Sequence, residues 1–167
     1  MSGSSARQRR SLAFPRLLTT LLLLPLLAAC LPADGTIPRQ ISVEWPEKRL
    51  AFIADERLGS VRAFRIGGGA PVLVAQSTPR ARTAVRDLAL DARRGELWVL
   101  GRDSVDVHAA ETLAQRWRIP LEARDVARLR LGADGIELHA ASGVLLGRID
   151  MRTRVAVWRP AWQVRAG

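Results

Sequence analysis

The sequence has few of the residues that form disulfides or bind metals in small proteins, with one cysteine and two histidines among 167 residues. It also has a single lysine. One cysteine excludes a disulfide framework and a cysteine-based zinc site. Two histidines argue against a histidine-rich metal centre. No stretch beyond residue 30 shows a 3.6-residue apolar period, so the sequence does not predict a helical domain. Apolar residues still make up 48% of the chain, which excludes wholesale disorder and allows a hydrophobic core.

Positive charge comes almost entirely from arginine. The formal net charge is +10, from 26 basic and 16 acidic residues. Four arginines lie in the first 29 residues, which contain no acid, so 22 basic residues face 16 acidic ones in the remainder. This smaller excess permits an acidic partner without requiring one.

The first 29 residues have the order of an export signal. A basic start precedes an apolar stretch of about 13 residues, Leu17 to Ala29. A membrane-spanning helix needs about 20 apolar residues, whereas this shorter length is typical of a signal-peptide core. The segment Arg9 to Leu12 faintly resembles a twin-arginine signal, so the export route stays open. The sequence predicts a removable signal peptide over residues 1–29.

The apolar stretch ends in Leu27-Ala28-Ala29-Cys30. This motif resembles the lipobox of bacterial lipoproteins, in which small residues precede a cysteine that is acylated and becomes the new N-terminus. The resemblance implies cleavage between Ala29 and Cys30, lipidation of Cys30 and attachment to a membrane through lipid chains. Leu31 rather than Asp follows, which by the same resemblance implies the periplasmic face of the outer membrane of a Gram-negative-type bacterium. Residues 30–39 are rich in proline and glycine and predict a short tether.

The rest of the chain is repetitive. Seven identities, Trp117 with Trp158 among them, join residues 86–120 to residues 127–160 at one offset of 41 positions. Residues 40–78 contain a fainter first copy. A period near 41 residues lies in the range of β-propeller blades.

Each copy predicts four short strands separated by turn residues. The predicted strands are Ile41–Trp45, Leu50–Ala54, Val61–Ile66 and Val72–Ala75; then Arg86–Leu90, Glu96–Leu100, Ser104–Ala109 and Ala114–Ile119; then Val126–Leu131, Ile136–Ala140, Val144–Ile149 and Val155–Trp158. The predicted fold class is therefore all-β, with three four-stranded antiparallel propeller-like blades. They occupy approximately residues 40–78, 85–120 and 125–160 of a repeat domain spanning 40–167.

The ends of the last two copies resemble the repeat of quinoprotein-like β-propellers, in which Asp-x-x-Thr is followed by Trp five residues after the Thr. The last copy has Asp150, Thr153 and Trp158, and the middle copy has Thr112 and Trp117 but lacks the Asp. The Gly that follows the Thr in the family is Leu113 in one copy and Arg154 in the other. The resemblance implies a structural role: the Asp and Thr cap the turn, and the Trp docks against the neighbouring blade.

One lipoprotein group with such propellers belongs to the outer-membrane protein assembly machinery and acts there as a non-enzymatic scaffold. This chain resembles a short relative of that group. A closed propeller needs about four blades, and the sequence predicts three. Two copies forming a six-bladed ring, another protein covering the ends, or a non-propeller packing of the three units all remain open.

The sequence contains no nucleophile–base constellation and no phosphate loop. His108 and His139 occupy non-equivalent repeat positions and fit ordinary strand residues. Asp103 and Asp106 flank a hairpin strand and are typical of a solvated turn. We therefore expect no catalytic residue, no metal and no cofactor.

Alternating arginines on single strands predict a basic surface, because alternate strand residues share a face. They are Arg116 and Arg118 in the middle copy, and Arg128 and Arg130 in the last. Trp117 is expected on the opposite face from its arginine neighbours, which argues against nucleic-acid binding. The sequence thus favours a lipid-anchored, non-enzymatic interaction or scaffold module with a protein partner or a second copy. Binding of an anionic envelope glycolipid or polysaccharide by the arginines is the alternative, and a subunit or fragment of a propeller enzyme is a third.

Overall fold

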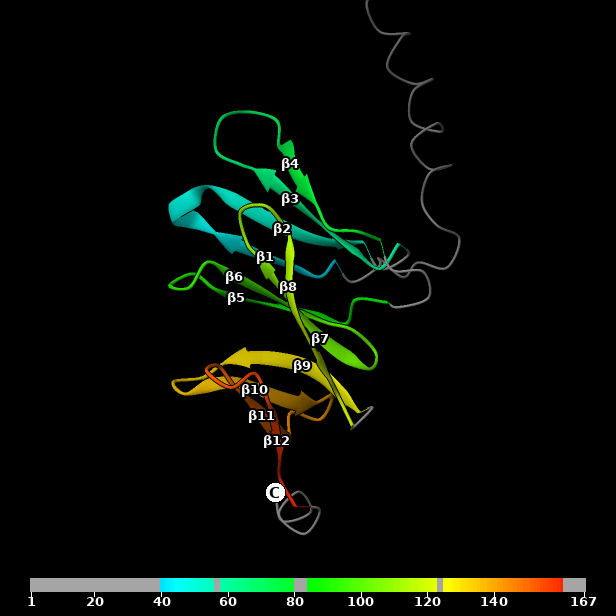
Figure 1. The fold of residues 1–167 in the computed structure, drawn as a ribbon. Coiled ribbons are helices and arrows are strands. Elements are labelled where there is room, and N and C mark those ends of the chain that lie inside the picture. The colour runs from blue at the N-terminus through cyan, green and yellow to red at the C-terminus, as the bar shows by residue number, and fades with distance from the viewer. Residues whose placement is uncertain (1–39, 56–57, 80–83, 123–124, 161–167) are drawn as a thin grey trace, which may run out of the picture. The chain divides into compact units, whose positions relative to one another are not determined.

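The repeat domain consists of three antiparallel sheets (Figure 1). The computed structural model describes residues 40–55, 58–79, 84–122 and 125–160. In these residues the strands are β1 (Ser42–Trp45), β2 (Leu50–Asp55), β3 (Ser60–Arg65), β4 (Val72–Gln76), β5 (Asp87–Asp91), β6 (Glu96–Leu100), β7 (Ser104–Ala109), β8 (Gln115–Pro120), β9 (Val126–Leu131), β10 (Gly135–Ala140), β11 (Leu145–Asp150) and β12 (Ala156–Trp158). A short 3-10 helix, Pro46–Lys48, joins β1 to β2. The predicted all-β fold with three four-stranded propeller-like blades is confirmed.

Each sheet is a meander in which consecutive strands are neighbours. We call β1–β4 blade 1, β5–β8 blade 2 and β9–β12 blade 3. The first strand of blade 2 contacts the first strands of both other blades, since β5 contacts β1 and β9. Blade 2 therefore lies between blade 1 and blade 3, as the ribbon shows (Figure 1).

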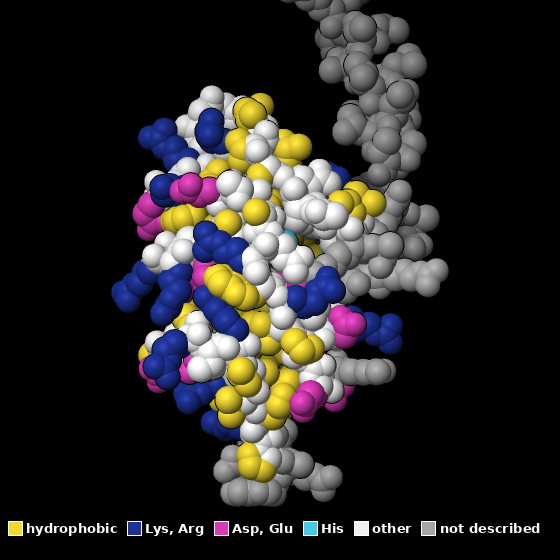
Figure 2. Space-filling model, viewed as in Figure 1, with side chains coloured by type: hydrophobic (Ala, Val, Ile, Leu, Met, Phe, Trp, Pro, Cys, Tyr) yellow, Lys and Arg dark blue, Asp and Glu magenta, His cyan; other side chains and the backbone are white. Residues whose placement is uncertain are grey.

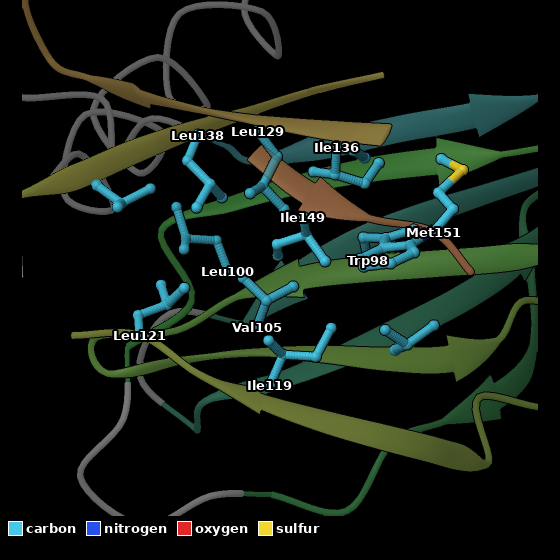
Figure 3. Close-up of a cluster of buried hydrophobic side chains, with 13 residues drawn as sticks. Trp98, Leu100, Val105, Ile119, Leu121, Leu129, Ile136, Leu138, Ile149 and Met151 are labelled. Atoms are coloured by element: carbon cyan, nitrogen blue, oxygen red, sulfur yellow. The ribbon is translucent and has the colours of Figure 1, made fainter. Parts of the chain in front are cut away.

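Two hydrophobic cores hold the blades together, one on each side of blade 2. The first core joins blade 1 to blade 2, and Phe52, Ala63 and Leu97 are fully buried in it. The second joins blade 2 to blade 3. In Figure 3, Trp98 and Val105 of blade 2 face Leu129, Ile136 and Ile149 of blade 3. Alternate residues of β6 enter different cores, Leu97 the first and Trp98 the second, so this central strand is buried on both faces.

The turns that follow β7 and β11 have the same geometry, which confirms the repeat at this point. The backbone N–H of Leu113 donates to Ala109 at 2.8 Å, and that of Arg154 donates to Asp150 at 2.9 Å. Leu113 and Arg154 both adopt the left-handed conformation, with φ of 55° and 61°. These are the two positions where the resembled repeat has glycine, the residue that adopts this conformation without strain. At both positions the chain forms this turn without glycine, so the backbone there is strained.

The repeat loses its register in the strand after this turn. A bulge between Val107 and His108 in the β7–β8 pairing adds Arg116 to β8, so Trp117 lies opposite Val107. No such bulge interrupts β11–β12, where Trp158 lies opposite Gly147. The two tryptophans, although 41 positions apart in sequence, therefore point to opposite faces of their blades.

Candidate functional site

Trp117 and Trp158 both meet the interface between blades 2 and 3, but from opposite sides. Trp158 packs against the second core and is half-buried. Trp117 shares the face of Val107, a member of the same core, yet it remains 43% exposed. The expected docking of both rings thus occurs at this interface, although Trp117 is covered there only in part. The inserted bulge residue turns that ring to the rim of the interface.

Arg154 joins blade 3 to blade 2 through three side chains. Its guanidinium donates to both carboxylate oxygens of Glu96, at 2.7 and 3.1 Å. It also lies 5.0 Å from the ring centre of Trp98 and 4.6 Å from that of Trp117. Glu96 is buried, with a side chain only 4% exposed, and this fork-like contact supplies its carboxylate with hydrogen-bond donors. Sequence reasoning missed this cluster, because Arg154 was recognised only as a departure from glycine.

The motif residues Asp150 and Thr153 have the turn-capping role that the resemblance implies. One carboxylate oxygen of Asp150 accepts hydrogen bonds from the backbone N–H groups of Arg152 and Thr153 and from the Thr153 hydroxyl. The Thr153 bonds, backbone first, hold the pKa of the Asp150 carboxyl below its usual range. In the middle copy the Thr112 hydroxyl accepts from the backbone N–H of Ala114 at 3.3 Å. These residues shape the hairpins.

Arg116 and Arg118 do not form the predicted stripe. Arg118 donates to Asp106 at 3.3 Å, whereas Arg116 lies 3.8 Å from Glu96 on the side of blade 3. Asp106 and Glu96 lie on opposite sides of blade 2. The bulge at Arg116 breaks the alternation of β8, so Arg116 and Arg118 do not share a face. The two arginines are therefore engaged with different acids on different faces, and the prediction of a shared basic face is wrong for this pair.

Arg128 and Arg130 do share a face, as predicted, and it is the outer face of blade 3. Arg128 lies opposite His139 and Arg130 opposite Glu137, which in turn lies opposite Arg148. We call the surface formed by these five residues the basic face. Two of its members interact, since the Nε2 atom of His139 lies 2.9 Å from a carboxylate oxygen of Glu137. The remaining excess charge is positive and belongs to the three arginines.

A hollow of about 360 Å³ adjoins the basic face. Leu145, Gly147, Val157 and Trp158 line it together with charged neighbours, including Arg148. Gly147 allows β12 to approach closely, because a Cβ there would lie 2.6 Å from the carbonyl oxygen of Val157. Blade 3 therefore presents an apolar depression beside its arginines.

A second cavity, of about 470 Å³, lies between blades 1 and 2. Ser77 comes from the end of blade 1, and Asp106, His108 and Arg118 come from blade 2. The Nδ1 atom of His108 lies 2.9 Å from the Leu113 carbonyl oxygen, which ties the ring to the turn. Asp106 is only 5% exposed, so its expected place in a solvated turn is wrong. Its carboxylate is instead part of a buried polar wall that the sequence did not indicate.

The described residues contain no group of three or more His, Cys, Asp or Glu side chains placed to hold a metal ion. Within the same part of the chain, no helix has the length and apolarity needed to cross a membrane. The predicted cleavage site at Ala29, the lipidation site Cys30, the signal segment and the tether over residues 30–39 lie outside the described residues.

Comparison with known proteins supports the architecture alone. No protein-family model matches the chain, and no curated protein matches it. Among solved structures, a β-propeller protein in a complex of KlAtg21 with the coiled-coil of AgAtg16 is similar, with a TM-score of 0.52 and 14% sequence identity. The match covers 75% of this chain and 42% of that one, so the chain spans less than half the length of this propeller. At such low identity the likeness establishes a propeller-like fold.

Proposed function

We propose that this chain is a lipid-anchored, non-enzymatic interaction module of the bacterial cell envelope, and that it binds an acidic partner protein through the basic face of blade 3. The observation that carries the proposal is a contrast between two equivalent blade faces. At three positions of the face that blade 2 turns toward blade 3 the residue is small or apolar, and the equivalent position on the outer face of blade 3 is arginine or histidine. The matched positions are Ala89 with Arg130, Trp98 with His139, and Val107 with Arg148. At two other positions of these faces, Asp87 of blade 2 is matched by Arg128 and Glu96 by Glu137.

This contrast indicates what the outer face of blade 3 can bind. Arginines at the positions of a buried core would be costly to cover with another apolar blade, because their charges would lose water without gaining partners. In repeat arrays, a polar outer face is typical of a capping unit that faces solvent or a charged partner. Carboxylate groups match the planar fork of arginine, so an acidic protein surface fits the basic face.

The same contrast bears on closure by two copies. A six-bladed ring would set the basic face against the outer face of blade 1, where Ile53 and Phe64 lie opposite to the core-facing Phe52 and Ala63. Glu44, which is exposed, and Asp55 share that outer face with them, so a second copy stays the alternative to a different protein as partner.

The lipid anchor is the second part of the proposal. Its support is the lipobox-like Leu27-Ala28-Ala29-Cys30 motif after an apolar stretch of signal-peptide length. The sites of possible chemistry within the described residues are engaged in structural contacts, such as Glu96 with Arg154 and His139 with Glu137. Such contacts are consistent with a scaffold.

The test is charge reversal on the basic face. The full chain is crosslinked in cells with a cleavable reagent and purified, and the partners of three forms are compared: wild type, Arg130→Glu with Arg148→Glu, and Arg93→Glu with Arg102→Glu. The last pair is the matched control, because both residues are exposed on turns of blade 2. We expect one acidic protein to be lost severalfold in the first variant only. Equal recovery from all three forms would refute the basic face as the binding surface.

Binding of an anionic glycolipid or polysaccharide is the second candidate, because phosphate and carboxylate groups on either would suit the same arginines. The two candidates separate by the chemistry of the bound species. A glycolipid or polysaccharide would be recovered as a non-protein adduct, and its binding should weaken steeply with salt because it depends on charge alone.

A further inference from the structure

The edge strand of blade 1 differs from the corresponding strands of the other two blades. Val72, Leu73 and Val74 on β4 are 59%, 51% and 38% exposed. They belong to an uncharged run of fourteen residues, Ile66 to Pro79, which covers the whole β3–β4 hairpin tip and β4. Exposed apolar runs of this kind mark contact surfaces or aggregation hazards.

The other blades protect the same edge with charge and proline. In blade 2, β8 carries Arg116, Arg118 and Pro120, and in blade 3, β12 is followed at once by Arg159 and Pro160. Arginine and proline at an edge strand discourage pairing with other chains. Neither β4 nor β12 has an arginine or a proline within its bounds, but β12 lies between Arg154 and Arg159, whereas β4 is preceded by Pro71 and has no charged residue near either end.

The exposed apolar side chains of β4 lie on both sides of the sheet. Leu73 is opposite Phe64, on the outer face, and Val72 is opposite Arg65, on the other face. A protein that packs on one face would cover only alternate side chains. A lipid surface, in contrast, surrounds an edge from both sides.

A bulge in the β3–β4 pairing also argues against addition of another strand. The register shifts between Ala63 and Phe64, so Val74 is the extra residue on β4. Such a bulge increases local twist and interrupts the regular row of backbone groups that a new strand would need.

Two arginines flank the hairpin. Arg65 ends β3 directly before the uncharged run, and the backbone carbonyl of Arg49 accepts a hydrogen bond from Ile66 at 2.9 Å. Figure 2 shows hydrophobic side chains gathered over the β3–β4 end of the domain, with Lys and Arg side chains beside them. Basic residues at the border of an apolar patch favour anionic lipid headgroups.

We propose that the β3–β4 hairpin of blade 1 docks onto a lipid bilayer surface that contains anionic headgroups. Val72, Leu73 and Val74 enter the boundary between headgroups and acyl chains, and Arg49 and Arg65 remain at the headgroups. The free backbone groups of the β4 edge keep the strand at this depth, because they would be unsatisfied in hydrocarbon.

The length of the chain before the domain fits this geometry. Nine residues lie between Cys30 and Gln40, so the ten Cα-to-Cα steps between them span at most about 35 Å. From β1, the edge strand β4 is three strand spacings away, or about 14 Å. The docking rests on the proposed lipid anchor for its proximity to a membrane. A lipid anchor alone leaves the domain free to tumble, and the hairpin would fix its orientation.

The test places a polarity-sensitive dye on single cysteines of the full chain. Leu73→Cys is the probe, and Val157→Cys is the matched control because Val157 is a 55% exposed valine on the outer strand of blade 3. Both proteins are extracted from membranes, labelled, and reconstituted in phosphatidylcholine vesicles with or without phosphatidylglycerol. Cys30 carries its lipid as a thioether and takes no dye.

We expect the dye at position 73 to shift to shorter wavelength and to be quenched by brominated acyl chains severalfold more than the dye at position 157. Phosphatidylglycerol should strengthen the shift. Adding Val72→Glu and Val74→Glu to the Leu73→Cys chain should return the aqueous spectrum, and because both valines are exposed the fold should persist.

Three results would overturn the proposal. Equal quenching at both positions would mean unspecific contact, and an aqueous spectrum at position 73 in membrane-bound protein would mean no docking. A shift that grows with protein density without quenching by brominated lipid would assign the strand to a second copy. Failure of the anchor is distinguishable from all three, because unlipidated Cys30 would make the wild-type chain take up dye.

Discussion

Replacement of Arg154 by glycine separates two contributions that act at the same residue. The change removes the forked contact to Glu96 and the stacking on Trp98 and Trp117. It also relieves the left-handed backbone, for which φ is 61°. The sign of the effect on stability shows whether the side chain or the backbone dominates.

The magnitudes favour the side chain. Breaking a buried ion pair by removing one partner costs about 3–5 kcal/mol. Arg116, at 3.8 Å from Glu96, offsets part of this loss, so the lower end of the range applies. Relief of the left-handed conformation stabilises the variant by about 1–2 kcal/mol. The greater conformational freedom of glycine in the unfolded chain destabilises it by about 0.5–1 kcal/mol. With the lost stacking, worth about 1 kcal/mol, the net loss is about 2.5–4 kcal/mol.

Urea unfolding of the domain from Gln40 onward, followed by tryptophan fluorescence, measures this loss through the transition midpoint. Arg49→Gly is the matched control, because Arg49 is exposed and has the same backbone conformation, with φ of 51°. We expect that variant to be unchanged or stabilised by up to about 1 kcal/mol. If Arg154→Gly behaved like Arg49→Gly, the proposed lock between blades 2 and 3 would be refuted.

Three further predictions concern single residues. Trp98→Ala should cost about 3–5 kcal/mol because the ring is fully buried, and Trp117→Ala only about 1 kcal/mol because the ring is 43% exposed; equal urea midpoints for the two variants would contradict the assigned burial. The pKa of Asp150 is lowered in the fold, so its contribution is present above the usual carboxyl range and is lost as the pH falls through the folded pKa. Asp150→Asn should therefore flatten the acid side of the stability profile, and parallel profiles for variant and wild type would count against the cap. Cys30→Ala should abolish incorporation of labelled palmitate, and unchanged labelling would disprove the lipid anchor.

The strand pattern was predictable because alternate residues of a strand point to different faces of its blade. Val105 and Val107, for example, belong to the core between blades 2 and 3, as their alternation with polar residues indicates. The fainter blade 1 was found from its turns and its four-strand rhythm. The repeat offset also located the equivalent turns at Leu113 and Arg154. The last two copies have the same backbone conformation at these positions, although their side chains differ.

The contacts between blades were not predictable from the same patterns. A single bulge at Arg116 reverses the phase of β8, so matching tryptophans and alternating arginines have different surroundings in the two copies. Burial of Glu96 and Asp106 depends on which arginine of another strand reaches each acid. Sequence spacing contains no signal for such long-range pairs, whereas Arg128 and Arg130 were correctly placed on one face because β9 is regular at those positions.

The lipid-docking hairpin and the basic face belong to different blades, which suggests a division of roles within the domain. Blade 1 has the uncharged edge strand and follows the segment for which we propose a lipid anchor. Blade 3 has the arginines that we assign to partner binding. A membrane contact at one blade and a protein contact at another would present the partner site away from the lipid surface.

The central claim, that blade 3 binds an acidic protein, is tested most directly by photocrosslinking in living cells. A photoreactive amino acid replaces Arg148 on the basic face or Arg102 on an exposed turn of blade 2. The account predicts one discrete protein adduct from position 148, absent from position 102 and different in mass from a second copy of this chain. Protein adducts of equal yield at both positions, an adduct with a second copy, or only a glycolipid or polysaccharide adduct at position 148 would contradict it.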